Sequence, residues 1–189
     1  SGLAMQKYRI SSRPASGAGH QFSHVWEMEH LGMDQEPPLT HGFKVGLGTI
    51  SVLALWEKVL EHDFTTLDVD TAVAKWPTAE EMEAKVRANF TGDMLEPAVK
   101  QTMDKYLDAD ALRERLEVVR SKWPTIQERC RAQVMPAAHV EKIIQAVGGI
   151  YHPAQIGLTR ERFHDTYYRC QMIRSRYTLL DLLVETGTI

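Results

Sequence analysis

The sequence predicts an all-α protein, and three observations lead to this prediction. Apolar residues recur at intervals of three and four along almost the whole chain, which is the spacing of one helical face. Alternating runs of β-branched residues, the usual sign of strands, are scarce. Residues that favour helix starts precede several of the periodic segments. For 189 residues we expect a single domain over 1–189, long enough to bury a substantial core.

The first third of the chain is expected to contain two long helices. Pro14 breaks an early loop, and Thr40 is placed to cap the second helix. This second helix is so rich in apolar residues that we expect it at the centre of the core. In chain order, the expected elements are a helix end over 1–9, a loop over 10–16, a helix from Gly17 to Leu31, a loop over 33–40 with Pro37-Pro38, and a helix over 41–61.

The remaining residues predict a series of shorter amphipathic helices. Thr78 and Glu81 form a capping-box pattern. Pro124 and Thr159 are expected to open helices, and Gly148-Gly149 to close one. The expected helices cover 68–76, 78–90, 94–106, 109–121, 124–134, 137–147, 159–174 and 178–186.

Composition and charge exclude several classes of function. The formal net charge of -3 provides no basic field for nucleic acid. No apolar run approaches the roughly 20 residues of a membrane span, and no leader sequence is recognisable. Cys130 and Cys170 are too few for a disulfide scaffold, so we expect reduced thiols in a cytoplasmic protein. The opening residues lack an initiator methionine, which favours a piece of a longer polypeptide.

Three histidines form the most informative pattern in the sequence. His20 and His24 are four residues apart in a predicted helix, so they lie on one face of it. His41 begins the next predicted helix, and a turn between antiparallel helices would bring it opposite His20. Imidazole is the commonest metal-ligand side chain, so the pattern suggests a divalent metal site. The alternative is a chance pair of histidines with no ligand.

Glycines inside the second long helix point to a close approach. Gly42, Gly46 and Gly48 each cost about 1 kcal/mol relative to alanine in a helix interior. Either a neighbouring helix or a ligand would explain them. The Gly-x-Gly at 46–48 is not a dinucleotide fingerprint, because no predicted strand precedes it.

These same segments resemble a known family. Residues 11–32 read SSRPASGAGHQFSHVWEMEHLG and residues 40–50 read THGFKVGLGTI. Together they resemble the signature of bacterial glycerol-1-phosphate dehydrogenases, in the superfamily of iron-containing alcohol dehydrogenases, glycerol dehydrogenase and dehydroquinate synthase. Residues 172–187, MIRSRYTLLDLLVETG, resemble the family's closing helices, so the resemblance covers essentially the whole chain. One position departs from the family pattern, because Gly19 replaces the usual acidic residue.

The resemblance implies the C-terminal, helical, metal-binding half of a two-domain enzyme with the dehydroquinate synthase-like fold. The α/β domain that binds the nucleotide is absent from this chain, so we expect the isolated chain to be inactive. The whole enzyme would use NAD(P)(H) to reduce dihydroxyacetone phosphate to sn-glycerol 1-phosphate by hydride transfer. A divalent zinc, nickel or iron ion would lie in the cleft. The family also suggests a homodimer.

The resemblance further implies roles for individual residues. His20 and His41 match the metal ligands of the superfamily, together with an acidic ligand expected before Ser1. His24 matches a histidine that does not bind the metal, and it either relays a proton or shapes the pocket.

Two cations near the motif are candidates for binding the substrate phosphate. Arg13 and Lys44 lie nearest to it in sequence, and the alternative is that both are ordinary surface cations. Arg174 and Arg176 are expected to support structure instead.

Two other functions stay open. One is another polyol or secondary-alcohol dehydrogenase of the same superfamily, whose substrate has no phosphate for Arg13 and Lys44 to bind. The other is a helical metal-binding or interaction module without catalysis.

Overall fold

The computed structural model describes residues 16–188, and these residues form nine α-helices and no strand. The predicted all-α class is therefore confirmed. The elements expected over 1–15 lie outside the described residues. The helices are α2 (Ala18–Met28), α3 (His41–Glu61), α4 (Val69–Ala74), α5 (Ala79–Asn89), α6 (Leu95–Met103), α7 (Ala109–Arg131), α8 (Ala137–Ala146), α9 (Arg160–Met172) and α10 (Leu179–Glu185).

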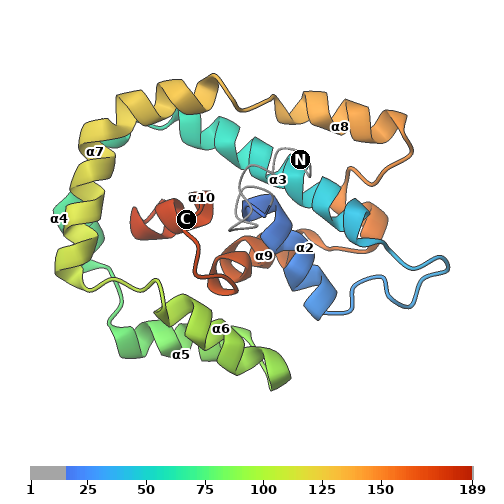
Figure 1. The fold of residues 1–189 in the computed structure, drawn as a ribbon, viewed down its shortest axis with the longest axis horizontal. Helices are drawn as coiled ribbons and strands as arrows, with labels where there is room; N and C mark the ends of the chain where they lie inside the picture. Colours follow the sequence, from blue (N-terminus) through green and yellow to red (C-terminus); the bar gives the residue numbers. More distant parts are fainter. Residues whose placement is uncertain (1–15, 189) are drawn as a thin grey trace, which may run out of the picture.

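The helices form an open ring with the last helix inside it (Figure 1). Helix α3 makes one side of the ring, α7 and α4 the next, and α5 and α6 the third. Helices α2 and α9 pack together and complete the circuit, while α8 lies along the outside of α3. No helix of the described residues is long and apolar enough to cross a membrane.

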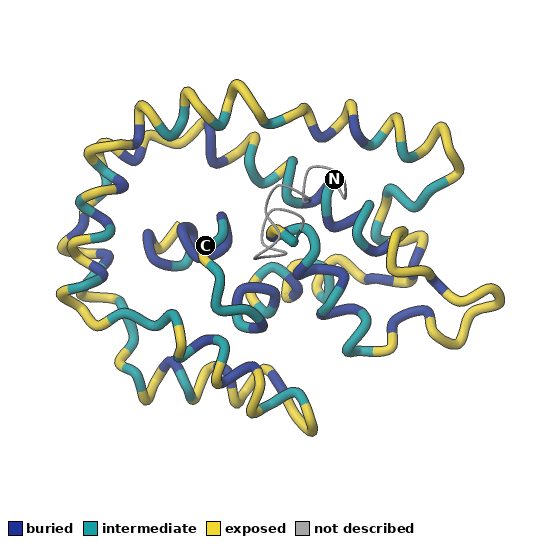
Figure 2. Tube along the Cα trace, in the orientation of Figure 1, coloured by how far each residue is buried: buried dark blue, intermediate teal, exposed yellow. Residues whose placement is uncertain are grey.

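Apolar side chains fill the junctions between these helices, and the outward faces are exposed (Figure 2). The largest cluster joins α2 to α9, α3, α5 and α6 around Phe22 and Trp26, both fully buried. A second cluster joins α3, α7 and α10 around Phe64 and Trp123. Helix α3 contributes to both clusters, which agrees with its predicted central place.

Local capping explains why many predicted helix starts are correct. The Thr40 hydroxyl accepts a hydrogen bond from the backbone N–H of Phe43, and α3 has the predicted bounds of 41–61. Thr78 and Glu81 form the predicted capping box at α5. Each such cap satisfies backbone N–H groups that have no partner within the helix.

Two predicted boundaries are wrong for identifiable reasons. Pro124 does not open a helix, because α7 runs continuously from Ala109 to Arg131 with the proline inside it. Proline removes one backbone hydrogen bond, and the buried neighbours Val119 and Trp123 hold the helix together around it. The helix curves strongly along its course (Figure 1), as expected for one that contains proline.

Helix α2 ends at Met28 rather than at the predicted Leu31. His30 adopts a left-handed backbone with φ of 55°. The Leu31 N–H then bonds to the Trp26 carbonyl at 2.9 Å, which closes the helix in a Schellman motif.

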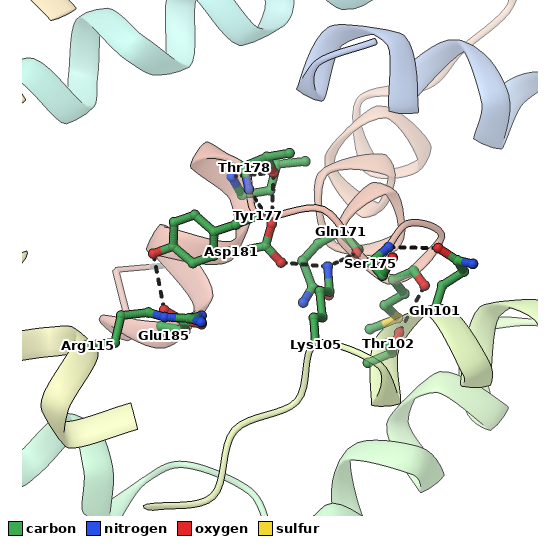
Figure 3. Close-up of polar contacts among 12 residues, drawn as sticks. Gln101, Thr102, Lys105, Arg115, Gln171, Ser175, Tyr177, Thr178, Asp181 and Glu185 are labelled. Carbon is green, nitrogen blue, oxygen red and sulfur yellow. Dashed lines mark hydrogen bonds and ion pairs between the residues drawn. The ribbon is translucent and has the colours of Figure 1, made fainter. Parts of the chain in front are cut away.

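Charged and polar contacts hold α10 inside the ring (Figure 3). Lys105, which follows α6, lies 2.5 Å from Asp181 of α10 and also donates to the Gln171 carbonyl. Arg115 of α7 lies 2.6 Å from Glu185, the last residue of α10. The final helix is thus tied to two separate sides of the ring.

Candidate functional site

The site forms where α2 and α3 cross at two glycines. A Cβ atom on Gly48 would lie 2.3 Å from the Gly19 carbonyl oxygen and 2.9 Å from the Phe22 Cβ. A neighbouring helix therefore explains the glycine at 48. A Cβ on Gly46 would be 3.4 Å from Ile144, and at Gly42 the nearest atom would be 3.9 Å away, so only Gly48 among these three glycines requires glycine for space.

Gly19 belongs to the same crossing. A Cβ there would lie 3.1 Å from backbone atoms of Gly48 and Thr49. A side chain at position 19 would require these neighbouring atoms to move by a few tenths of an ångström. The departure from the family pattern is thus part of a close helix contact in this chain.

The crossing brings the three predicted histidines together. The ring centroids of His20 and His24 are 4.8 Å apart, and those of His20 and His41 are also 4.8 Å apart. The His24 and His41 centroids are 6.0 Å apart. The side chains are partly exposed, 26% for His24 and 48% for His41, so the cluster lies at the surface of the described residues.

Glu27 joins this cluster, although the sequence analysis did not single it out. One carboxylate oxygen lies 2.5 Å from His41 Nδ1, and the other lies 3.3 Å from His24 Nδ1. Glu27 is seven residues after His20 and therefore shares its helical face. That spacing was the signal in the sequence that could have identified it.

The cluster shifts the pKa of three of its members. Burial raises the pKa of Glu27, but the hydrogen bonds from His41 and His24 outweigh it and the pKa is lowered. Burial lowers the pKa of His20 and of His24, and the positive charge of Arg174 lowers both further. At neutral pH the carboxylate is charged and both of these imidazoles are neutral.

A carboxylate only accepts hydrogen bonds, so each Nδ1 atom beside Glu27 carries the proton. In a neutral ring with its proton on Nδ1, the Nε2 atom keeps its lone pair. A lone pair on Nε2 is what a histidine needs in order to bind a metal ion or to take up a proton.

Of the two predicted phosphate-binding cations, only Lys44 belongs to the described residues. Arg13 lies outside the described residues. The Lys44 side chain is buried, with 1% of its surface exposed. A phosphate would reach Lys44 only by entering the interior with it or by displacing the residues that cover it.

An open cavity of about 490 Å³ adjoins the histidine cluster. His20 lines it together with Gly17 and Gly19 of the α2 start, and with Tyr177 and Thr178 of the chain before α10. Another cavity, of about 510 Å³, lies between α4, α5 and α9 and includes none of the three histidines. The cavity lined by His20 is therefore the one that adjoins the candidate site.

Within residues 16–188, no group of three or more histidine, cysteine, aspartate or glutamate side chains is arranged to hold a metal ion. The neighbouring rings of His20 and His41 provide two candidate metal ligands. The Glu27 carboxylate is hydrogen-bonded to the Nδ1 atoms of His41 and His24.

Comparisons with known proteins agree with the motif. A glycerol-1-phosphate dehydrogenase [NAD(P)+] of Geobacillus thermodenitrificans is 29% identical over 188 residues, and that of Geobacillus stearothermophilus is 27% identical over 186. The chain is homologous to part of glycerol-1-phosphate dehydrogenase. These alignments cover 98% of the chain but 36% of each relative, so the chain spans about a third of their length.

A shorter stretch is more similar. The glycerol-1-phosphate dehydrogenase [NAD(P)+] of Halalkalibacterium halodurans is 49% identical over 57 residues, which is 30% of the chain and 14% of that relative. No protein-family model matches the chain, and no solved structure matches it.

Proposed function

We propose that this chain supplies the metal- and substrate-binding part of an NAD(P)-dependent glycerol-1-phosphate dehydrogenase. The reaction would be the reduction of dihydroxyacetone phosphate to sn-glycerol 1-phosphate by hydride transfer. The observation that carries the proposal is the meeting of His20, His24 and His41 at the α2–α3 crossing. The homology to dehydrogenases of this name supports it.

The donor chemistry of the site fits a divalent ion in part. Two imidazoles that share one tetrahedral ion at about 2.0–2.1 Å have ring centroids roughly 5 Å apart. The centroids of His20 and His41 are 4.8 Å apart, so the two residues are close enough to serve as a pair of ligands. A further ligand would come from outside the described residues, as the family pattern also implies.

Each residue of the cluster would have a distinct role. His20 and His41 would hold the metal, and Glu27 would fix the ring of His41 through Nδ1. A bound divalent ion polarises the substrate ketone. His24, neutral at physiological pH, would take up a proton from solvent on Nε2 and then pass that proton to the oxygen of the reduced substrate.

The remaining roles are also proposals. Arg13 and Lys44 stay candidates for contacting the substrate phosphate. NAD(P)(H) would be held by another part of the enzyme, because residues 16–188 contain no strand on which a dinucleotide fingerprint could begin.

Metal analysis of histidine variants tests the assignment, using the product of the full reading frame that encodes this chain. His20→Ala and His41→Ala should each lose the metal and the activity, because each removes a direct bond to the ion. His24→Ala should keep the metal and lower turnover by about 10²–10⁴, the contribution of a proton-transferring group. His139→Ala, an exposed histidine of α8, is the control and should change neither.

Loss of metal from His24→Ala with retention in His20→Ala would reverse the two roles. Full activity in all three variants would reject the proposed site.

A further inference from the structure

The loop between α9 and α10, residues 173–178, has one end near the start of α2 and the other near its end. At one end, Arg176 donates a hydrogen bond to the Ser16 carbonyl, two residues before α2 begins. Tyr177 and Thr178 line the same cavity as His20. This end of the loop therefore lies beside the start of α2.

The other end of the loop lies beside the end of α2. Arg174 and Met28 line one cavity of about 290 Å³. Met28 is one helical turn beyond His24 and is the last residue of α2. Between these two ends, the Ser175 N–H donates a hydrogen bond to the side chain of Gln101 on α6.

Arg174 brings a positive charge to the histidines. Burial is the largest cause that lowers the pKa of His24 and of His20, and the charge of Arg174 lowers both further. These effects of the Arg174 charge on the two histidine pKa values agree with the position of the loop 173–178 near α2. Arg176 acts on His20 in the same direction.

The surroundings of Arg174 leave donors of its guanidinium available. One terminal nitrogen donates to the Ile173 carbonyl at 2.8 Å. No ion pair joins Arg174 to a carboxylate of residues 16–188, although Asp93 lines the same cavity. By contrast, Arg162 and Arg169 of the preceding helix both pair with Glu29.

A guanidinium has five donors in a planar fork, which suits the oxygens of a phosphate. Arg174 has no ion-paired carboxylate within residues 16–188, so its positive charge can attract an anion. We propose that Arg174 binds the phosphate of the substrate, next to the cluster of His20, His24 and His41. The identity of that substrate rests on the proposed function, whereas the binding of a phosphate group does not.

Titration of the 189-residue chain with inorganic phosphate tests this inference without any need for activity. The imidazole NMR signals of His20 and His24 should shift together as phosphate binds, and ³¹P NMR should give the same dissociation constant. Arg174→Gln should weaken binding about tenfold or more, because it removes a charge-assisted hydrogen bond. Arg174→Lys keeps the charge but loses the planar guanidinium, so its phosphate affinity should lie between those of the unaltered chain and Arg174→Gln.

Arg129→Gln is the matched control, since Arg129 is exposed near the end of α7. It should bind phosphate as the unaltered chain does. Circular dichroism melting curves should show that Arg174→Gln is folded. If Arg174→Gln does not fold, the phosphate affinity of Arg174→Lys tests the inference. Equal affinity in Arg174→Gln and the unaltered chain would overturn the inference, as would shifts that leave His20 and His24 unaffected.

A second measurement separates this inference from the proposed function. In the product of the full reading frame, Arg174→Gln should raise KM for dihydroxyacetone phosphate far more than it lowers kcat. It should leave KM for dihydroxyacetone, which has no phosphate, nearly unchanged. If no dehydrogenase activity is found but Arg174 still controls phosphate affinity, the proposed function fails and the anion site stands. An equal rise of KM for both ketones would count against a phosphate contact.

Discussion

Glu27 decides which nitrogen atoms the histidine cluster can use. Its two carboxylate oxygens face His41 Nδ1 at 2.5 Å and His24 Nδ1 at 3.3 Å. A hydrogen bond at one ring nitrogen fixes the tautomer and the orientation of the imidazole ring, and thereby the state of the other nitrogen. The sequence identified the histidines, and the structure adds the residue that aligns two of them.

Replacing Glu27 with glutamine should therefore loosen the site without removing any proposed metal ligand. The glutamine side chain has one acceptor oxygen, so it cannot accept from both rings. Imidazole ¹⁵N chemical shifts of the chain at pH 7.5 should show Nδ1 protonated in His41 and His24, and Glu27→Gln should lose this preference in at least one ring. Metal affinity of the full reading frame's product should fall about 10–100-fold.

Glu128→Gln provides the comparison, because Glu128 is exposed on α7. Its imidazole shifts and metal affinity should match those of the unaltered protein. Unchanged tautomers in Glu27→Gln would show that the carboxylate does not orient the rings.

At the scale of the elements, the distance between α2 and α3 determines whether the histidines meet. His20 and His24 are on α2, whereas His41 starts α3. A Cβ at Gly48 would clash with the Gly19 carbonyl, and a Cβ at Gly19 would be tight against Gly48 and Thr49, so glycine at both positions permits this close approach. The helix crossing and the site are thus consequences of the same two glycines.

Gly48→Ala should push the two helices apart. The added Cβ would lie 2.3 Å from the Gly19 carbonyl oxygen, which belongs to the backbone and cannot move alone. We expect a loss of about 1–3 kcal/mol in the free energy of unfolding, measured with a chemical denaturant, because overpacking of an interior has this effect. The nuclear Overhauser contact between the rings of His20 and His41 should weaken.

Gly42→Ala is the matched control on the same helix. Its Cβ would have nothing closer than the Thr40 hydroxyl at 3.9 Å. Alanine is the better helix former by up to about 1 kcal/mol, so this variant should be as stable as the unaltered chain or more so. If Gly48→Ala behaved like Gly42→Ala, the close crossing would not be what holds the site together.

At the scale of the whole molecule, buried ion pairs fix the last helix within the ring (Figure 3). Asp181 and Glu185 of α10 are buried, with 3% and 5% of their surfaces exposed. Glu185 contacts Arg115 at 2.6 Å and the Tyr177 hydroxyl at 3.1 Å. The same segment leads back to the loop that carries Arg174, so the position of α10 also bears on the candidate site.

Stability should depend on pH through Glu185. Burial raises its pKa above the ordinary value of 4.5, and the partial offset by Arg115 does not cancel this. Because the folded state binds this proton more tightly than the unfolded state, the carboxyl's contribution is fully present below pH 4.5 and is lost as the pH rises through the raised value. Glu185→Gln removes this titration.

The measurement is the difference in unfolding free energy between the unaltered chain and Glu185→Gln, from pH 4 to pH 8. The unfolding free energy of the unaltered chain, taken relative to that of Glu185→Gln, should decrease as the pH rises. The corresponding difference for Glu128→Gln should stay constant, since Glu128 is exposed. A difference for Glu185→Gln that grows with pH would mean that Arg115 lowers the pKa of Glu185 overall.

The sequence by itself determined the all-α class, several helix starts and the shared helical face of His20 and His24. Helix α3 has its predicted bounds, and the caps at Thr40 and Thr78 are the predicted ones. The common face of His20 and His24 follows from their spacing alone. These features depend on neighbours within about four residues along the chain, which is the range over which helical hydrogen bonds and caps act.

Only the tertiary structure decided the features that join distant residues. Glu27 and His41 are 14 residues apart, and Arg174 reaches α2 from the far end of the chain. The continuity of α7 through Pro124 and the burial of Lys44 were likewise not predictable from the sequence. Each depends on how helices pack, because contacts across helices can outweigh a local preference of a few kcal/mol and bring together side chains that no local pattern connects.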